Sequence, residues 1–339
     1  MRQRIWQIFV IILVLVNLIS AGGVGTTPAL AANPAAPAFA LSVTPEVVDN
    51  NAISGQYSSI ALDAEGVAHI AYFYDDNDGT PDGILMMASR HGGTWLSEPV
   101  DGASITGVTP SIAIDEDGMA HIAYYDQTNG DLRYAKQRTP DGWDYHTVDS
   151  PGNVGANCAL ALDSLQRPHI AYRDATNSTL KYATFNGTTW QISTIPGTSD
   201  FTYDSSIGLG LTSADLPRIA YRQMNGQIPK ALGYVQFNGT SWSVEAALTS
   251  TAVGDRFSLV MGAGDVPHIS FMDTSVGLKY MKKDGAWSTP ETVVASVNAG
   301  SLNDLALDPA GRPRIVYLDA TAMPYLLKIA YKDGATWRL

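Results

Sequence analysis

Six copies of one unit run through this chain, and this repeat constrains the fold more than any other feature. Each copy contains a short apolar segment that ends in an aromatic residue, at Tyr72, Tyr124, Tyr172, Tyr221, Phe271 and Tyr317. The spacings between consecutive copies are 52, 48, 49, 50 and 46 residues. A period of this length is typical of four-stranded propeller blades. The sequence therefore predicts an all-β, six-bladed β-propeller built from four-stranded antiparallel blades.

Each unit also carries a hairpin signal ahead of a tryptophan. Dipeptides such as Asp141-Gly142 and Asn186-Gly187 precede the repeat tryptophans Trp95, Trp143, Trp190, Trp242, Trp287 and Trp337. Such dipeptides favour two-residue type I′ turns, because glycine and asparagine tolerate a positive φ. We therefore expect a tight hairpin before every repeat tryptophan.

The two ends of the chain are predicted to meet in one blade. The sequence ends at Leu339, two residues after the sixth repeat tryptophan, so the last unit lacks an outer strand of its own. Thr44-Pro-Glu-Val-Val48 matches Thr289-Pro-Glu-Thr-Val293, which follows Trp287 in the fifth unit. We expect this N-terminal strand to complete the last blade, which removes an open sheet edge.

The N-terminal residues predict export. Residues 1–31 resemble a secretory signal, with Arg2 and Arg4, an apolar stretch and the small-residue site Ala29-Leu-Ala31. An uncleaved membrane anchor is the alternative, although the apolar run is short for a span. Residues 32–40 are predicted to be a flexible spacer and residues 41–339 the propeller. We expect a secreted or extracytoplasmic protein, a monomer with no membrane insertion after signal removal.

Charge and cysteine content limit the function classes. The formal net charge is −12, and removing the two signal arginines makes it −14. Nucleic acid and anionic membranes are therefore poor partners, since phosphate binding needs clustered lysines and arginines. The single cysteine, Cys158, lies in an apolar run. We expect it to be a buried, small apolar residue and not a catalytic thiol.

Residues that recur in every unit are predicted to serve the fold. The histidines His69, His121, His169 and His268 begin equivalent second strands, with Arg218 and Arg314 in the other two units. Equivalent residues of adjacent blades lie too far apart to share one metal, whose bonds to nitrogen are about 2 Å long. We expect these side chains to donate to a carbonyl group between blades or to a turn carboxylate. The repeated aspartates are expected to form turns.

Function is predicted where the units differ from one another. Arg173 and Arg222 directly follow the repeat tyrosines of two adjacent units, and Arg256 enters the fifth inner strand at the same end. Tyr203 lies in the longest loop of its kind, and Tyr57 holds an equivalent entry in the first unit. These five residues are a candidate site for a carboxylate or a sugar. Solvated loop residues without a ligand are the alternative.

One loop is rich in carboxylates. Asp76, Asp78 and Asp82 are close together, and oxygen ligands at alternate positions can hold Ca²⁺. Tyr74 stands where the first ligand of a regular calcium loop would be, so an empty acidic loop is the alternative. We expect no other cofactor.

Several tryptophan turns carry a family resemblance. Gly92-Gly-Thr-Trp95, Gly187-Thr-Thr-Trp190, Gly239-Thr-Ser-Trp242 and Gly334-Ala-Thr-Trp337 resemble the second half of the Asp-box, the bacterial neuraminidase repeat of six-bladed sialidases. The Ser-x-Asp half is missing. The resemblance covers residues 41–339 and implies a secreted bacterial propeller of sialidase-like type. In that family three arginines clamp the substrate carboxylate, and a tyrosine paired with a glutamate is the nucleophile.

These observations lead to two main function hypotheses, and a purely structural or adhesive module is a third alternative. The first is an exported, non-catalytic binding propeller that recognises a glycan or a cell-surface protein through its loop-bearing face. The alternative is a sialidase-like glycoside hydrolase or another glycan-cleaving enzyme. Arg173, Arg222 and Arg256 imitate the arginine clamp, but Glu245 is expected in an outer strand, away from the channel.

Overall fold

The computed structural model describes residues 46–50, 53–75, 83–102, 105–138, 142–198, 206–226 and 228–339. The predicted signal, the spacer, Thr44, Tyr203 and the three candidate calcium ligands Asp76, Asp78 and Asp82 lie outside these ranges.

The described chain forms six antiparallel sheets in sequence order, which we number as blades 1 to 6. Blade 1 contains β1 (Ile53–Leu62), β2 (Ala68–Asp75), β3 (Ile84–His91) and β4 (Thr94–Asp101). Blade 2 contains β5 (Thr106–Ile114), β6 (Ala120–Asp126), β7 (Asp131–Gln137) and β8 (Trp143–Asp149). Blade 3 contains β9 (Val154–Leu162), β10 (Pro168–Asp174), β11 (Thr179–Phe185) and β12 (Trp190–Thr194). Blade 4 contains β13 (Ile207–Leu211), β14 (Pro217–Asn225), β15 (Ile228–Phe237) and β16 (Trp242–Thr249).

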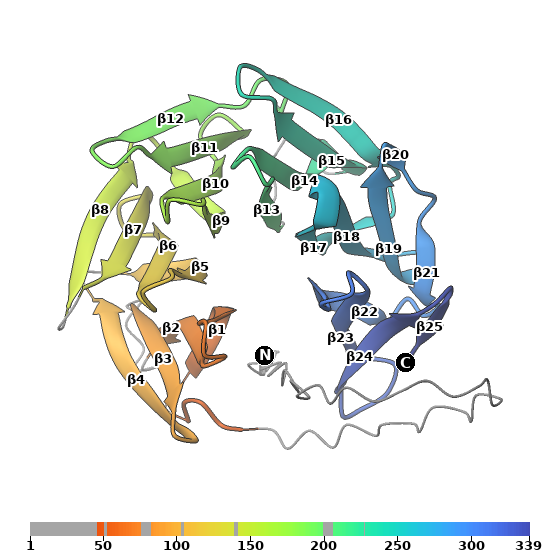
Figure 1. Ribbon diagram of the computed structural model, residues 1–339, viewed down its shortest axis with the longest axis horizontal. Coiled ribbons are helices and arrows are strands. Elements are labelled where there is room, and N and C mark those ends of the chain that lie inside the picture. Colours follow the sequence, from red (N-terminus) through yellow and green to blue (C-terminus); the bar gives the residue numbers. More distant parts are fainter. Residues whose placement is uncertain are drawn as a thin grey trace, which may run out of the picture.

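The last two blades have divided or short outer strands. Blade 5 contains β17 (Val253–Gly262), the 3₁₀ turn η1 (Ala263–Asp265), β18 (Val266–Asp273), β19 (Gly277–Asp284), β20 (Ala286–Trp287) and β21 (Glu291–Val294). Blade 6 contains β22 (Ala299–Leu307), β23 (Pro313–Asp319), β24 (Leu326–Asp333) and β25 (Thr336–Arg338). Figure 1 shows the six sheets as a ring, with the first strand of each blade nearest the axis. The predicted six-bladed propeller is confirmed.

The hairpins before the tryptophans are less uniform than predicted. His91 pairs with Thr94, so Gly92 and Gly93 form a two-residue turn, and both have a positive φ (56° and 88°). In blade 3, however, Phe185 pairs with Trp190, which leaves four residues in the turn. There the side chain of Asn186 accepts hydrogen bonds from the backbone N–H groups of Thr188 and Thr189, both at 2.9 Å. Blade 4 is alike, since Phe237 pairs with Trp242 and Asn238 accepts from two backbone N–H groups. The two-residue turn is therefore wrong for blades 3 and 4, because the asparagine side chain closes a longer turn.

The repeat tyrosines lie in the core, as predicted. Tyr124 and Tyr172 are fully buried, yet their hydroxyl groups donate to the carboxylates of Asp101 (2.6 Å) and Asp149 (2.7 Å). Each of these aspartates ends the outer strand of the preceding blade. The hydrogen bonds therefore satisfy a buried phenol and join two blades at the same time.

A second aromatic contact joins neighbouring blades. The repeat tryptophans Trp190, Trp242, Trp287 and Trp337 pack edge-on against a tyrosine in the third strand of the preceding blade, with ring centroids 5.2, 5.2, 5.1 and 5.4 Å apart. Hydrophobic clusters likewise span two blades, and one of them contains Tyr134 of blade 2 and Tyr172 of blade 3. Each interface between blades is thus a small core of its own.

The junction between blades 6 and 1 differs in detail from the prediction. The fourth strand of blade 6 is β25, from the C-terminal end of the chain, and residues 46–50 form no strand. Glu46 nevertheless holds blade 1 in the way that Glu291 holds blade 6. Glu46 accepts hydrogen bonds from Arg90 (2.8 and 2.7 Å) and from Trp95 Nε1 (3.0 Å). Glu291 accepts from Lys332 (2.6 Å) and from Trp337 Nε1 (3.0 Å).

Asp49 reproduces the hydrogen bond between a repeat tyrosine and an aspartate of the preceding blade. Its carboxylate accepts a hydrogen bond from Tyr72 at 2.8 Å, as Asp101 does from Tyr124. Residues 46–50 therefore stand, relative to blade 1, where the outer strand of a preceding blade would stand. The matched pentapeptides of the sequence correspond in these contacts, although not in strand pairing.

We predict that Arg90→Glu weakens ring closure, because the new carboxylate at position 90 would lie beside the carboxylate of Glu46 and repel it. The expected results are a lower melting temperature and faster proteolysis near residues 46–50. The double variant Glu46→Arg/Arg90→Glu should recover part of both, since it restores opposite charges, although an arginine at position 46 cannot accept the hydrogen bond of Trp95 Nε1.

Lys332→Glu is the matched control for this experiment. It breaks the equivalent pair with Glu291, where blades 5 and 6 stay linked by continuous chain. An Arg90→Glu protein that melts and is digested like the parent contradicts the closure role of Glu46.

Candidate functional site

The repeat histidines are structural, as predicted. The hydroxyl of Tyr134 donates to Nδ1 of His121 at 2.6 Å, and Nε2 of His121 donates to Asp115 at 3.0 Å. His169 makes the same pair of bonds to Tyr182 and Asp163. His69 bonds to Ser89 (2.8 Å) and Asp63 (3.2 Å). These side chains therefore connect the second strand, the third strand and a turn of their own blade.

Two of the other blades keep the same role with a different donor or acceptor. Arg314 donates to Asp308 at 2.8 Å, and Arg218 donates to the carbonyl of Phe237 at 2.9 Å. His268 bonds to Tyr280 at 2.5 Å, but Gly262 stands where blades 1, 2, 3 and 6 have an aspartate. Burial therefore lowers the pKa of His268 to about 4, with a smaller effect from the charge of Lys282.

The repeated aspartates are turn residues, as expected. Asp115 Oδ1 accepts hydrogen bonds from the backbone N–H groups of Asp117 (3.1 Å) and Met119 (2.8 Å). Burial opposes ionisation of this carboxyl, but the hydrogen bonds from His121 and the backbone lower its pKa overall. Within the described ranges, no group of three or more His, Cys, Asp or Glu side chains is placed to hold a metal ion. Cys158 is buried, and burial raises the pKa of its thiol to about 12.

The structure places four of the five predicted site residues on the loop-bearing face. The end of β10 pairs with the start of β9, so the loops that leave the second strand and enter the first lie at one face. Arg173 and Arg222 lie on β10 and β14 of adjacent blades. Arg256 and Tyr57 lie in the irregular first halves of β17 and β1, where the pairing shifts.

These residues are only partly brought together. Arg222 interacts electrostatically with Asp255, which precedes Arg256, so these two arginines belong to one region of blades 4 and 5. Tyr57 is 44% exposed with a φ of 51°, and it lies in blade 1, beyond blade 6 in the ring (Figure 1). Tyr57 therefore lies on a blade that adjoins neither the blade of Arg222 nor the blade of Arg256.

Arg222 is electrostatically unusual. Its side chain is half-buried, and desolvation lowers the pKa of its guanidinium group against the opposing effect of Asp255. Its Nε is buried without a hydrogen-bond partner among the described residues. Arg256 is exposed, and neither arginine has a described carboxylate within 4.0 Å.

Most basic side chains at repeated positions are, by contrast, paired. The third strands of four blades carry a basic residue opposite the repeat aromatic residue, at Arg133, Lys181, Lys279 and Lys328. Arg133 lies 3.4 Å from Asp101, Lys279 lies 2.9 Å from Asp273, and Lys328 lies 2.6 Å from Asp319. Lys181 pairs with Asp149. The repeat thus neutralises its own charges.

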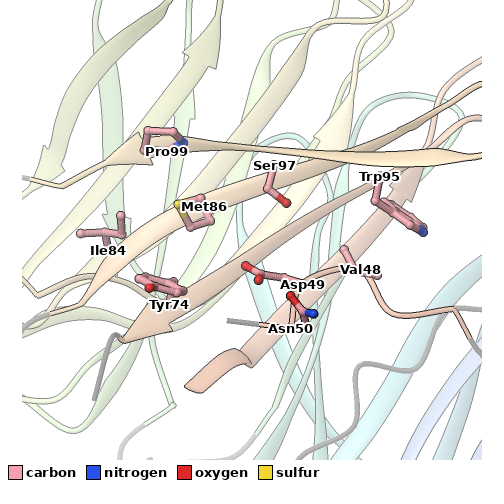
Figure 2. Close-up of a pocket in the computed structure, with 9 residues that line it drawn as sticks. All are labelled: Val48, Asp49, Asn50, Tyr74, Ile84, Met86, Trp95, Ser97 and Pro99. Carbon is pink, nitrogen blue, oxygen red and sulfur yellow. The ribbon is translucent and has the colours of Figure 1, made fainter. Parts of the chain in front are cut away.

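A pocket that the sequence did not indicate lies at the junction of blades 6 and 1. Its volume is about 530 Å³, and it is lined by Val48, Asp49, Asn50, Tyr74, Ile84, Met86, Trp95, Ser97 and Pro99. Figure 2 shows the carboxylate of Asp49 between the group of Tyr74, Ile84 and Met86 and the ring of Trp95. The pocket thus combines two aromatic side chains, an apolar wall and three polar side chains.

The pocket exists because blade 1 departs from the repeat. Met86 stands opposite Tyr72, where Arg133 and Lys181 stand in the next two blades. Tyr74 stands where those blades have Asp126 and Asp174. A comparison of the residues opposite the repeat tyrosines would have found this change in the sequence, but it requires the strand register.

Comparison with known proteins gives similarity of fold. No family model matches the sequence, and no curated protein matches it significantly. The solved structure of AofleA from Arthrobotrys oligospora is 13% identical, with a TM-score of 0.55 and 84% of each chain covered. A mutant of Aleuria aurantia lectin in complex with Fucα1-6GlcNAc is 13% identical, with a TM-score of 0.56, covering 84% of this chain and 94% of the lectin.

An enzyme is equally similar. A PL25 ulvan lyase is 14% identical, with a TM-score of 0.56, covering 80% of this chain and 79% of the lyase. Since lectins and a lyase share this architecture, the likeness shows the fold, and the activity has to be argued from residues.

We predict that His121→Ala lowers the free energy of unfolding by about 1–3 kcal/mol, because Asp115 and Tyr134 lose a buried partner. Thermal or urea denaturation measures the change. His91→Ala, at an exposed histidine of blade 1, is the control and should have little effect. Loss of glycan affinity without loss of stability would assign His121 to a binding site instead.

A second prediction concerns acid stability. The folded-state pKa of His268 is about 4 and its ordinary value is 6.5, so the unfolded state binds more protons between these pH values. The stability that neutral His268 contributes is complete above pH 6.5 and is lost as the pH falls toward 4. Urea unfolding at pH 7, 5.5 and 4.5 should therefore show falling stability. His268→Gln should reduce the slope of unfolding free energy against pH by an amount that corresponds to at most about one bound proton per molecule. An unchanged slope would contradict a lowered pKa of His268.

Proposed function

We propose that this chain is an exported, non-catalytic propeller that binds a glycan through its loop-bearing face. The structural neighbours support a glycan as the partner. The Aleuria aurantia lectin structure contains a fucosylated disaccharide, and the SapL1 lectin, with a TM-score of 0.53, is in complex with α-methyl fucoside. The predicted signal supports export, and no helix of the described residues is long and apolar enough to cross a membrane.

The observation that carries the proposal is the contrast between repeated and unique basic side chains. Arg133, Lys279 and Lys328 pair with aspartates, whereas Arg222 and Arg256 have no described carboxylate at ion-pair distance. Desolvation of Arg222 opposes its charged form, the charge of Asp255 offsets this only in part, and no carboxylate of the described residues lies at ion-pair distance. A site where the protein tolerates such a cost is a candidate binding site.

Guanidinium groups select a class of ligand. They present several N–H donors in a plane, which suits carboxylate and sulfate groups. Arg222 and Arg256, with Arg173 on the adjacent blade, therefore favour an anionic glycan. Tyr203 belongs to the proposed site from its place in the sequence, as the loop before blade 4. Tyr57, in a different part of the ring, would contact only an extended ligand.

Sialidase-like hydrolysis needs a tyrosine and glutamate pair at the channel. Glu245 lies on the outer strand β16, where it binds Lys283 and accepts a hydrogen bond from Trp287 at 3.0 Å. This glutamate therefore stabilises an interface between blades. Binding explains the described residues better than catalysis does.

We predict that Arg222→Ala/Arg256→Ala weakens binding of anionic glycans by about tenfold or more, because each charge-assisted hydrogen bond contributes roughly 1.5–3 kcal/mol. A glycan array on the mature protein identifies the ligands, and calorimetric titration of the best anionic glycan measures the change. The melting temperature should stay close to that of the parent, since neither arginine forms an ion pair with a residue that the structure describes.

Arg312→Ala is the control for loss of a positive charge, because Arg312 is exposed and pairs with Asp308 at 2.8 Å. A double variant that binds every anionic glycan like the parent contradicts the site. Turnover of chromogenic glycosides by the parent, absent from a heat-inactivated sample, would favour the hydrolase instead.

A further inference from the structure

The pocket at the junction of blades 6 and 1 has the composition of a small-molecule site. Its volume of about 530 Å³ falls within the roughly 300–1,000 Å³ typical of such sites. Tyr74 and Trp95 supply aromatic surface, and Ile84 and Met86 supply an apolar wall. Ser97 and Pro99 are exposed at its edge, so the pocket is open to solvent.

A defined polar group faces this apolar wall. The Oδ2 atom of Asp49 accepts a hydrogen bond from the buried hydroxyl of Tyr72 at 2.8 Å, which orients the carboxylate. Figure 2 places this carboxylate, with Ser97 nearby, beside Tyr74 and Met86. An oriented carboxylate next to an aromatic face can bind a pair of vicinal hydroxyl groups while the ring packs on carbon.

The other blades show what a closed version of this pocket looks like. At the position of Met86, Lys181 binds Asp149, the aspartate that receives the hydrogen bond of Tyr172. In blade 4 the equivalent residue is Gly233, and an added Cβ there would lie 2.3 Å from the ring of Tyr221, so the tyrosine fills the space. Blade 1 has neither a basic side chain nor a displaced ring at this point.

We propose that this pocket is a second carbohydrate site, which binds one neutral hexopyranose with its apolar edge against Ile84 and Met86. The carboxylate of Asp49 accepts hydrogen bonds from sugar hydroxyl groups, and an aromatic ring of Tyr74 or Trp95 covers the C–H face. A 6-deoxyhexose fits best, because its methyl group meets the apolar wall where a hydroxymethyl group would lose hydrogen bonds to water. This inference rests on the proposed glycan-binding function for its ligand class. The residues are different, however, and the ligand is a neutral sugar bound by a carboxylate instead of an anionic glycan bound by arginines.

The experiment compares two sugars that differ only at C6. Methyl α-L-fucoside and methyl α-L-galactoside are titrated against the full mature protein by NMR. We expect the deoxy sugar to bind at least threefold more tightly than the galactoside. Absence of binding by both sugars at millimolar concentrations, or preference for the galactoside, overturns the proposal.

The decisive variant restores the repeat. Met86→Lys/Tyr74→Asp introduces the residue pair found in blades 5 and 6, where Lys279 and Lys328 bind Asp273 and Asp319. The lysine is expected to fill the pocket and pair with the new or existing aspartate, so folding is retained while affinity falls at least tenfold. Asp49→Asn is a milder variant with nearly the same volume, and it should also weaken binding.

The two sites are separated by their controls. Arg222→Ala/Arg256→Ala should leave methyl α-L-fucoside binding unchanged, and Met86→Lys/Tyr74→Asp should leave anionic glycan binding unchanged. A folded Met86→Lys/Tyr74→Asp protein that binds the deoxy sugar like the parent overturns the junction site alone. If instead that protein does not fold, unchanged binding by Asp49→Asn overturns it.

Discussion

The ring depends on contacts in which a repeat tryptophan packs on a tyrosine of the blade before it, as Trp190, Trp242, Trp287 and Trp337 do. In four of the interfaces this is an edge-on contact with centroids 5.1–5.4 Å apart. Three of the four tyrosines also form a hydrogen bond with a buried histidine, at His121, His169 and His268. One side chain therefore takes part in the packing between blades and in the polar network within a blade. The repeat histidines serve the fold because they fix the ring that the next blade packs against.

Two chemical kinds of interface occur around the repeat tryptophans of five blades, and blade 2, with Gln137 opposite Trp143, belongs to neither kind. In blades 1, 5 and 6 a glutamate of the preceding outer segment binds a basic side chain and the tryptophan Nε1, as Glu245 does with Lys283 and Trp287. In blades 3 and 4 a phenylalanine, Phe185 or Phe237, takes the basic position and packs on the tryptophan, with centroids 5.3 and 4.9 Å apart. The residue opposite the repeat tryptophan can therefore be a basic side chain that binds a glutamate of the preceding blade, or a phenylalanine that packs on the tryptophan.

The repeated features could be predicted from the sequence, and the features that occur once could be predicted only in part. Strand order, buried tyrosines and structural histidines follow from local pattern, since every unit repeats the same chemistry. The turn at Asn186 was predicted two residues too short, because a side chain competes there with backbone geometry. The arginines were found as departures from the repeat, but their relation to Tyr57 depends on which blades adjoin. The junction pocket depends on strand register, which pairs Met86 with Tyr72 across two strands.

The contacts of residues 46–50 have a consequence for how the ring responds to its surroundings. Val48, Asp49 and Asn50 line the junction pocket, while Glu46 and Asp49 hold the same segment on blade 1. The segment that forms one wall of the pocket is therefore also the segment that closes the ring. By mass action, any molecule that binds in the pocket adds to the free energy needed to detach residues 46–50 from blade 1. The added free energy is about 2.7 kcal/mol when the free ligand concentration is a hundred times the dissociation constant. A bound ligand would then lengthen the lifetime of the closed ring, because residues 46–50 would detach from blade 1 more slowly.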